Sequence, residues 1–104
     1  MHLDLRMLRA LVAVDQIGSF TDAARVLRFS TPAVSAQVQA LEKGCGTRLV
    51  HRRGSRVVLT EAGRRAVPLA RLMLAAAREL EHIGDASSDR GFGTRTFPVG
   101  PEDG

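Results

Sequence analysis

The sequence predicts a mainly α-helical fold, in which three helices form a core and a β-hairpin and a long helix follow. Apolar residues recur at helical spacing in four segments. Aromatic residues are scarce, with four Phe and no Tyr or Trp, so aliphatic side chains and alanine must fill a core of packed helices. Two short apolar runs flank an arginine-rich stretch around Gly54, which is typical of a hairpin. A chain of 104 residues allows one small domain.

The first helix is expected from about Leu5 to Ile17. Asp4 has a side chain that can cap its N-terminus, and Leu3 can pack against Leu8 in the first turns. Gly18 is expected to end the helix, because glycine adopts the left-handed conformation that closes helices. One apolar face is expected, formed by Leu5, Leu8, Leu11 and Val12.

The second helix is expected to be short, from about Phe20 to Arg28, with Ser19 as its N-cap and Asp22 three residues on, as in a capping box. Its inner face would consist of Phe20, Ala23, Ala24 and Leu27. The paired alanines allow two helices to cross closely. That is a requirement of a helix-turn-helix unit.

A turn at residues 29–32 separates this helix from the third, which should run to about Lys43. Pro32 suits the first turn of a helix and makes Thr31 the expected N-cap. Gly44 and Gly46 should break the helix. Val34, Val38 and Leu41 would face inward, and the outer face is small, polar and free of acidic residues. Such a face suits contact with base edges in a DNA groove, although an ordinary solvated surface is the alternative. The outer residues are Ala33, Ser35, Ala36, Gln37 and Gln39.

The predicted hairpin has Leu49 and Val50 leading in, a turn over residues 51–56, and an outgoing strand at residues 57–59. Arginines at positions 52, 53 and 56 surround the turn. Such a wing can lie along a sugar-phosphate backbone and neutralise it. A charged hairpin that only faces solvent is the alternative. Together these elements predict a winged helix-turn-helix.

A final helix is expected over residues 61–83, with Thr60 as its cap. Pro68 should kink or split it. A heptad-like apolar seam suits a partner helix, and packing on the chain's own core is the alternative. The predicted regions are a DNA-binding domain at 1–60, a linker and dimerisation helix at 61–83, and a disordered tail at 84–104. The seam consists of Leu69, Met73, Ala76, Leu80 and Ile83.

Charge is distributed unevenly along the chain. Residues 1–66 hold eleven Lys/Arg and five Asp/Glu, a net charge of +6, whereas residues 67–104 hold four and six, a net charge of −2. The basic part could attract a polyanion, although a basic solvated surface is common. Cys45 is the only cysteine, so no intrachain disulfide is possible, and a near-buried lone thiol would be inert. We expect no signal peptide or membrane span, and a cytoplasmic protein.

Enzymatic activity is not expected from this sequence. The histidines, at positions 2, 51 and 82, are dispersed and show no metal-ligand spacing with Cys45. The sequence contains no glycine-rich phosphate loop and no nucleophile motif. No cofactor, metal or small-molecule ligand is therefore expected on this chain.

An ordered set of motifs over about sixty residues resembles the N-terminal DNA-binding region of LysR-type transcriptional regulators. The set includes Gly18-Ser19-Phe20-Thr21 with Ala23-Ala24, Thr31-Pro32-Ala33-Val34-Ser35, and Leu59-Thr60-Glu61-Ala62-Gly63. The resemblance implies that double-stranded DNA is the partner and that family-type dimers form through the linker helix. It further implies that Arg52 and Arg53 of the wing approach the minor groove or its phosphates. The residues that it places on the DNA-facing side of the recognition helix are Thr31, Pro32, Ser35, Ala36 and Gln37.

Several positions depart from the family's pattern. The family usually has Gln where this chain has Thr31, and often Arg where it has Ala36, so the preferred DNA site is expected to differ. Cys45 replaces the usual Leu and Val50 the usual Phe, which should thin the packing under the wing. The ligand-sensing domain of full-length members is also missing from the sequence.

The leading hypothesis is therefore a sequence-specific DNA-binding transcriptional regulator without its own effector sensor. An alternative of another class is a protein-interaction module, in which the linker helix pairs with a full-length relative and forms a heteromer. Binding to DNA would then be secondary.

Overall fold

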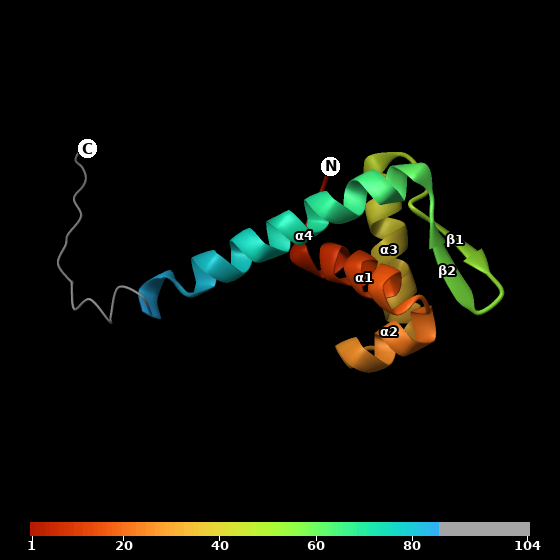
Figure 1. Ribbon diagram of the computed structural model, residues 1–104, viewed down its shortest axis with the longest axis horizontal. Helices are drawn as coiled ribbons and strands as arrows, with labels where there is room; N and C mark the ends of the chain where they lie inside the picture. The colour runs from red at the N-terminus through yellow and green to blue at the C-terminus, as the bar shows by residue number, and fades with distance from the viewer. Residues whose placement is uncertain (86–104) are drawn as a thin grey trace. The chain divides into compact units, whose positions relative to one another are not determined.

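The computed structural model describes residues 1–85, and the helical architecture with one hairpin that the sequence predicts is confirmed (Figure 1). The chain divides into two compact units, Met1–Leu74 and the part from Ala75 onward. The predicted disordered tail lies outside the described residues, apart from positions 84 and 85. The elements are α1 at Leu5–Ile17, α2 at Phe20–Leu27, α3 at Thr31–Cys45, β1 at Val50–Arg53, β2 at Arg56–Leu59 and α4 at Glu61–Glu81.

Helix α1 has the bounds and the caps that the sequence predicts. The Asp4 carboxylate accepts hydrogen bonds from the backbone N–H groups of Arg6 at 2.9 Å and Met7 at 3.3 Å, and Gly18 closes the helix with a φ of 83°. Partial desolvation would raise the pKa of Asp4, but these hydrogen bonds and the Arg6 guanidinium outweigh it and hold that pKa below its ordinary value. The Asp4 cap is thus a charged one at neutral pH.

Helix α2 is one residue shorter than expected. Ser19 caps it as predicted, accepting a 3.1 Å hydrogen bond from the backbone N–H of Asp22. The helix ends at Leu27 because Arg28 adopts a left-handed conformation with a φ of 63°. Ala23 and Ala24 are buried, as their place on the predicted inner face of this helix requires.

The core of the first unit is mainly aliphatic and is shared by α1, α2, α3, the start of β1 and the first half of α4. The predicted inner residues of α3 are all buried. The predicted inner face of α2 is buried as well, except for Leu27, which is half-buried. Burial of each large aliphatic side chain contributes on the order of 1.5–3 kcal/mol. The largest fully buried side chains are Leu11, Val14, Val34, Val38 and Leu49.

The N-cap of α3 is Ser30, so the prediction that Thr31 caps this helix is wrong. The Ser30 hydroxyl accepts from the backbone N–H of Ala33 at 3.2 Å, and its carbonyl accepts the first helical hydrogen bond from Val34. Thr31 is the first helical residue, and Pro32 lies within the first turn, where its missing N–H removes no helical bond.

The C-terminus of α3 also lies later than predicted. Gly44 lies inside the helix, which continues to Cys45, and Gly46 ends it with a φ of 74°. A glycine inside a helix lowers its stability without breaking it. Cys45 is exposed, so the prediction of a near-buried thiol is wrong.

The hairpin is tighter than the sequence suggested. Its strands pair in an antiparallel register that joins Val50 to Leu59 and Arg53 to Arg56, which leaves only Gly54 and Ser55 in the turn. Gly54 has a φ of 64°, as the first central residue of a two-residue hairpin turn requires. The broad turn predicted over residues 51–56 is therefore wrong, because the arginines extend the strands.

Helix α4 runs through Pro68 without interruption, so the predicted split does not occur. A proline inside a helix removes one hydrogen bond and costs about 3 kcal/mol. Pro68 is exposed, whereas its neighbours Val67 and Ala70 are buried in the core of the first unit. Packing on the two sides of Pro68 offsets the lost bond. The helix ends at Glu81, about two residues before the predicted end.

Candidate nucleic-acid interface

The outer face of α3 presents small and polar side chains without a carboxylate over its first two turns. Pro32 and Ala36 are exposed there, and Thr31, Ser35 and Gln37 are half-buried. The five residues that the resemblance assigned to DNA therefore lie on two successive turns of one helix. An approaching base edge would meet hydroxyl, amide and methyl groups on this face.

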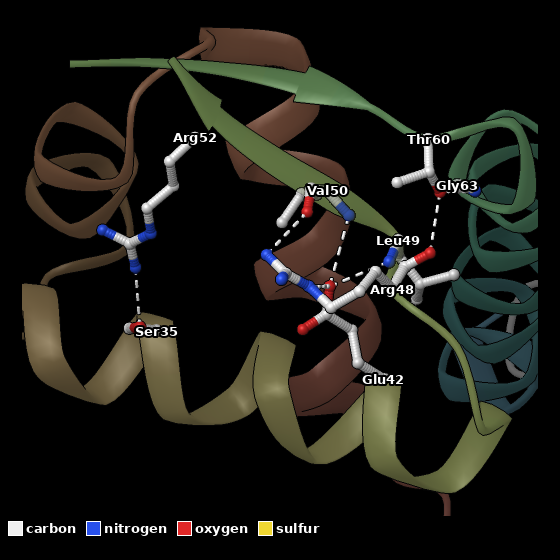
Figure 2. A network of polar contacts seen from close by, with 8 residues as sticks. All are labelled: Ser35, Glu42, Arg48, Leu49, Val50, Arg52, Thr60 and Gly63. Atoms are coloured by element: carbon white, nitrogen blue, oxygen red, sulfur yellow. Dashed lines mark hydrogen bonds and ion pairs between the residues drawn. The ribbon is translucent and has the colours of Figure 1, made fainter. Parts of the chain in front are cut away.

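Arg52 connects the hairpin to two helices. Its Nη2 donates a 2.8 Å hydrogen bond to the Ser35 hydroxyl in α3, as Figure 2 shows, and its guanidinium carbon lies 3.9 Å from the centre of the Phe20 ring in α2. A guanidinium stacked on an aromatic face is held by a cation–π interaction. The sequence pattern did not indicate this contact, because Phe20 was assigned only to the core.

The other two wing arginines lie beside the turn. Arg53 and Arg56 are register partners, and both side chains are exposed. Neither forms an ion pair with a carboxylate within residues 1–85. Two unpaired cations at one hairpin end can attract phosphate groups.

Glu42 fixes the start of the wing. Its side chain is only 11% exposed, and its Oε2 accepts from the backbone N–H groups of Leu49 at 2.8 Å and Val50 at 3.2 Å (Figure 2). Arg48 donates to the same carboxylate from Nε at 3.4 Å and to the Val50 carbonyl from Nη2 at 3.0 Å. One largely buried carboxylate thereby sets where the chain leaves α3 and enters β1.

Thr60 fixes the other end of the hairpin, and its predicted role as the cap of α4 is confirmed. The Thr60 hydroxyl accepts from the backbone N–H of Gly63 at 2.9 Å and donates to the Arg48 carbonyl at 2.7 Å. Its own N–H donates to the Leu49 carbonyl at 3.0 Å. Gly63 lies so close to the Leu49 carbonyl oxygen that a β-carbon at position 63 would overlap it.

A polar cavity of about 170 Å³ lies between the hairpin and the starts of α2 and α3. It offers guanidinium groups and hydroxyls, which are donors that phosphate oxygens accept. The residues that line it are Phe20, Thr21, Thr31, Arg52, Gly54, Ser55, Arg56 and Val57.

A second, apolar cavity of about 180 Å³ lies where α1, the end of α3 and the first half of α4 meet. Leu69 and Met73 of the predicted seam line it, together with Met1 and Leu3. Leu69 is 62% exposed and Met73 42% exposed. In the second unit Ala76, Leu80 and Ile83 are exposed as well. None of the seam residues is buried within the part of the chain that the structure describes.

Residues 1–85 contain no group of three His, Cys, Asp or Glu side chains that could hold a metal ion. No helix in that range is both long and apolar enough to cross a bilayer.

Comparison with known proteins identifies the family to which this geometry corresponds. The model of the family described as "Bacterial regulatory helix-turn-helix protein, lysR family" matches residues 5–64. The RuBisCO operon transcriptional regulator of Allochromatium vinosum is 46% identical over 83 residues, which are 80% of this chain and 28% of that protein. The SDS degradation transcriptional activation protein of a Pseudomonas species is 39% identical over 101 residues, which are 97% of this chain and 33% of that protein.

Solved structures agree with the sequence comparison. The crystal structure of the CbnR_DBD–DNA complex has a TM-score of 0.77 and 31% identity, and the match covers 83% of this chain and 99% of that one. The chain thus corresponds to one part of the longer curated relatives, since it spans about a third or less of their length.

Proposed function

Because this chain belongs to the LysR family of bacterial regulatory helix-turn-helix proteins, we propose that it regulates transcription by binding double-stranded DNA in a sequence-specific way. The observation that carries the proposal is the joining of α3 to the hairpin. A helix face without carboxylates and an arginine-rich wing are held together by the bond from Arg52 to Ser35. This combination suits a groove that is lined by phosphates.

In this proposal the outer face of α3 reads the major groove. Pro32 and Ala36 are exposed at the start of the helix, and the Ala36 methyl group suits contact with the methyl group of thymine. Thr31, Ser35 and Gln37 supply hydroxyl and amide groups that can hydrogen-bond to base edges. Small side chains demand that the helix approach the bases closely, so the fit of α3 in the groove contributes to selectivity.

The hairpin contributes affinity more than selectivity. Arg53 and Arg56 lie next to the turn and contact phosphates or the minor groove, whereas Arg52 lies nearer to α3. The polar cavity beside Arg56 and Thr21 receives a backbone phosphate. Contacts of this kind fix the register of the protein on DNA and release counterions.

The active species is a homodimer held by α4. A single recognition helix covers only a few base pairs, and a two-fold dimer reads two half-sites of a palindrome. Five seam side chains are exposed, and an exposed apolar stripe is unusual on a monomer. The dimer surface comprises Leu69, Met73, Ala76, Leu80 and Ile83.

Selection from a pool of random duplexes tests the proposal. The chain is expected to enrich one motif, with two related halves if the dimer reads them. Ser35→Glu should abolish enrichment, because it places a negative charge against the groove. Gln16→Glu adds the same charge at an exposed position of α1 and serves as the control, which should enrich the parent motif. Recovery of an unbiased pool by the unmodified chain would refute specific binding.

A further inference from the structure

We infer that Ser35 contacts the base edge as a hydrogen-bond donor, because Arg52 occupies its acceptor side. This inference rests on the proposed function and goes further, since it names the chemical feature of DNA that one position of the site selects. The preferred feature is an acceptor atom on the major-groove edge, and the disfavoured one is the amino group of cytosine.

The direction of the bond between the two side chains is fixed by chemistry. A guanidinium carries only donors, so at 2.8 Å the Arg52 Nη2 donates and the Ser35 Oγ accepts. The hydroxyl keeps one hydrogen and one further lone pair. Within residues 1–85 no hydrogen bond is donated by the Ser35 hydroxyl, so its hydrogen is available to an acceptor outside the chain.

Arg52 is held in place from the opposite side as well. Its guanidinium lies 3.9 Å from the centre of the Phe20 ring, and Phe20 is only 6% exposed. The backbone of Arg52 is paired with Val57 in the hairpin. A fixed aromatic platform and a paired strand therefore leave the arginine little freedom to turn away from Ser35 when DNA approaches.

The charge of Arg52 strengthens the serine as a donor. A charge-assisted bond to the oxygen polarises the hydroxyl, and neighbouring hydrogen bonds reinforce one another in a partly dry interface. An amino group approaching the remaining lone pair would meet the guanidinium N–H groups and would leave the hydroxyl hydrogen without a partner. Guanine N7 and O6, adenine N7 and thymine O4 fit this donor, whereas cytosine N4 does not.

Arg52 is therefore a positioning residue in this site, and its charge alone does not fulfil the role. Lysine keeps the charge but lacks the planar group that stacks on Phe20 and reaches Ser35 at the same time. Arg52→Lys should retain affinity from phosphate attraction and lose selectivity at the base that faces Ser35.

A scan with modified bases tests the inference. The duplex enriched by the unmodified chain is prepared with one acceptor removed at a time, using 7-deazaguanine, 7-deaza-adenine, 2-aminopurine or 5-methyl-2-pyrimidinone. One position in each half-site should lower the affinity of the unmodified chain by about tenfold. Ser35→Ala, which suits a helix, and Arg52→Lys should both become insensitive at that position. Arg78→Lys, in the last turn of α4, should remain as sensitive as the parent.

Three results would overturn the inference while leaving DNA binding intact. They are a parent that tolerates every analogue, a Ser35→Ala variant that keeps the full pattern of sensitivity, and an Arg52→Lys variant that discriminates like the parent. Failure of the parent to enrich any duplex would instead refute the proposed function, so the two failures are distinguishable.

Discussion

The Arg52 guanidinium donates a 2.8 Å hydrogen bond to the hydroxyl of Ser35, a residue 17 positions earlier in the chain. This bond joins strand β1 of the hairpin to the outer face of α3. The residues between the two partners in the sequence include the second half of α3. The wing and the helix are therefore joined into one surface, and the residues that hold the hairpin in place affect both.

Glu42 is the first such residue. Replacing it with Ala leaves the backbone N–H groups of Leu49 and Val50 without their acceptor, which should lower the free energy of unfolding by about 1–3 kcal/mol. Glu42→Gln keeps an acceptor oxygen and should lose less. Denaturant unfolding measures the stability of both variants, with Glu79→Ala at an exposed position of α4 as the control. Equal stability of the Ala variant and the parent would contradict the assigned role.

Gly63 should not tolerate alanine. Alanine normally stabilises a helix interior, but a β-carbon here would overlap the Leu49 carbonyl oxygen, so a net loss of about 1–3 kcal/mol is expected. Gly84→Ala is the matched control, because a β-carbon there meets nothing within 4 Å. Thermal melting of both variants checks the sign. A Gly63→Ala variant that melts higher than the parent would show that the start of α4 does not lie close to the Leu49 carbonyl.

The wing arginines should govern the salt dependence of binding. The double variant Arg53→Ala, Arg56→Ala should bind all duplexes more weakly, and the slope of log affinity against log salt should fall by about two. Fluorescence anisotropy over a salt series measures the slope. Arg78→Ala, in the last turn of α4, should leave it unchanged. A double variant with the parental slope would remove the hairpin end from the interface.

The exposed seam should hold a dimer. Leu69 is 62% exposed and Leu80 70% exposed, and burying each contributes on the order of 1.5–3 kcal/mol before ordering costs. Replacing either with Glu should weaken dimerisation at least about tenfold in sedimentation. Val26→Glu, an equally exposed apolar site on α2, is the control. A parent that is monomeric at high micromolar concentration, or variants that dimerise like the parent, would contradict the proposal.

Periodicity and capping chemistry were sufficient to predict the order of the elements. Asp4, Ser19 and Thr60 cap helices as predicted, since a short polar side chain before an apolar run has few other roles. Val34, Val38 and Leu41 are buried because their spacing of four and three residues places them on one side of the helix, which faces the core. These features depend on nearby residues only.

The errors arose where distant packing or a choice between neighbours decides the structure. Ser30 and Thr31 both have side chains that can cap a helix. Which of them is the cap depends on whether Pro32 is the first or the second residue of the helix, and it is the second. Pro68 does not split α4, because the burial of Val67 and Ala70 outweighs the lost bond. The contact of Arg52 with Phe20 joins residues from separate elements, and periodicity carries no information about such a contact.

An altered-specificity experiment at Ala36 tests most directly whether the outer face of α3 reads sequence. Ala36 is exposed, and Arg in its place can donate two hydrogen bonds to guanine O6 and N7. Selection from random duplexes with the parent and with Ala36→Arg should give motifs that differ at one position in each half-site, where the variant gains guanine. Identical motifs bound with identical affinity would show that this helix does not read the DNA.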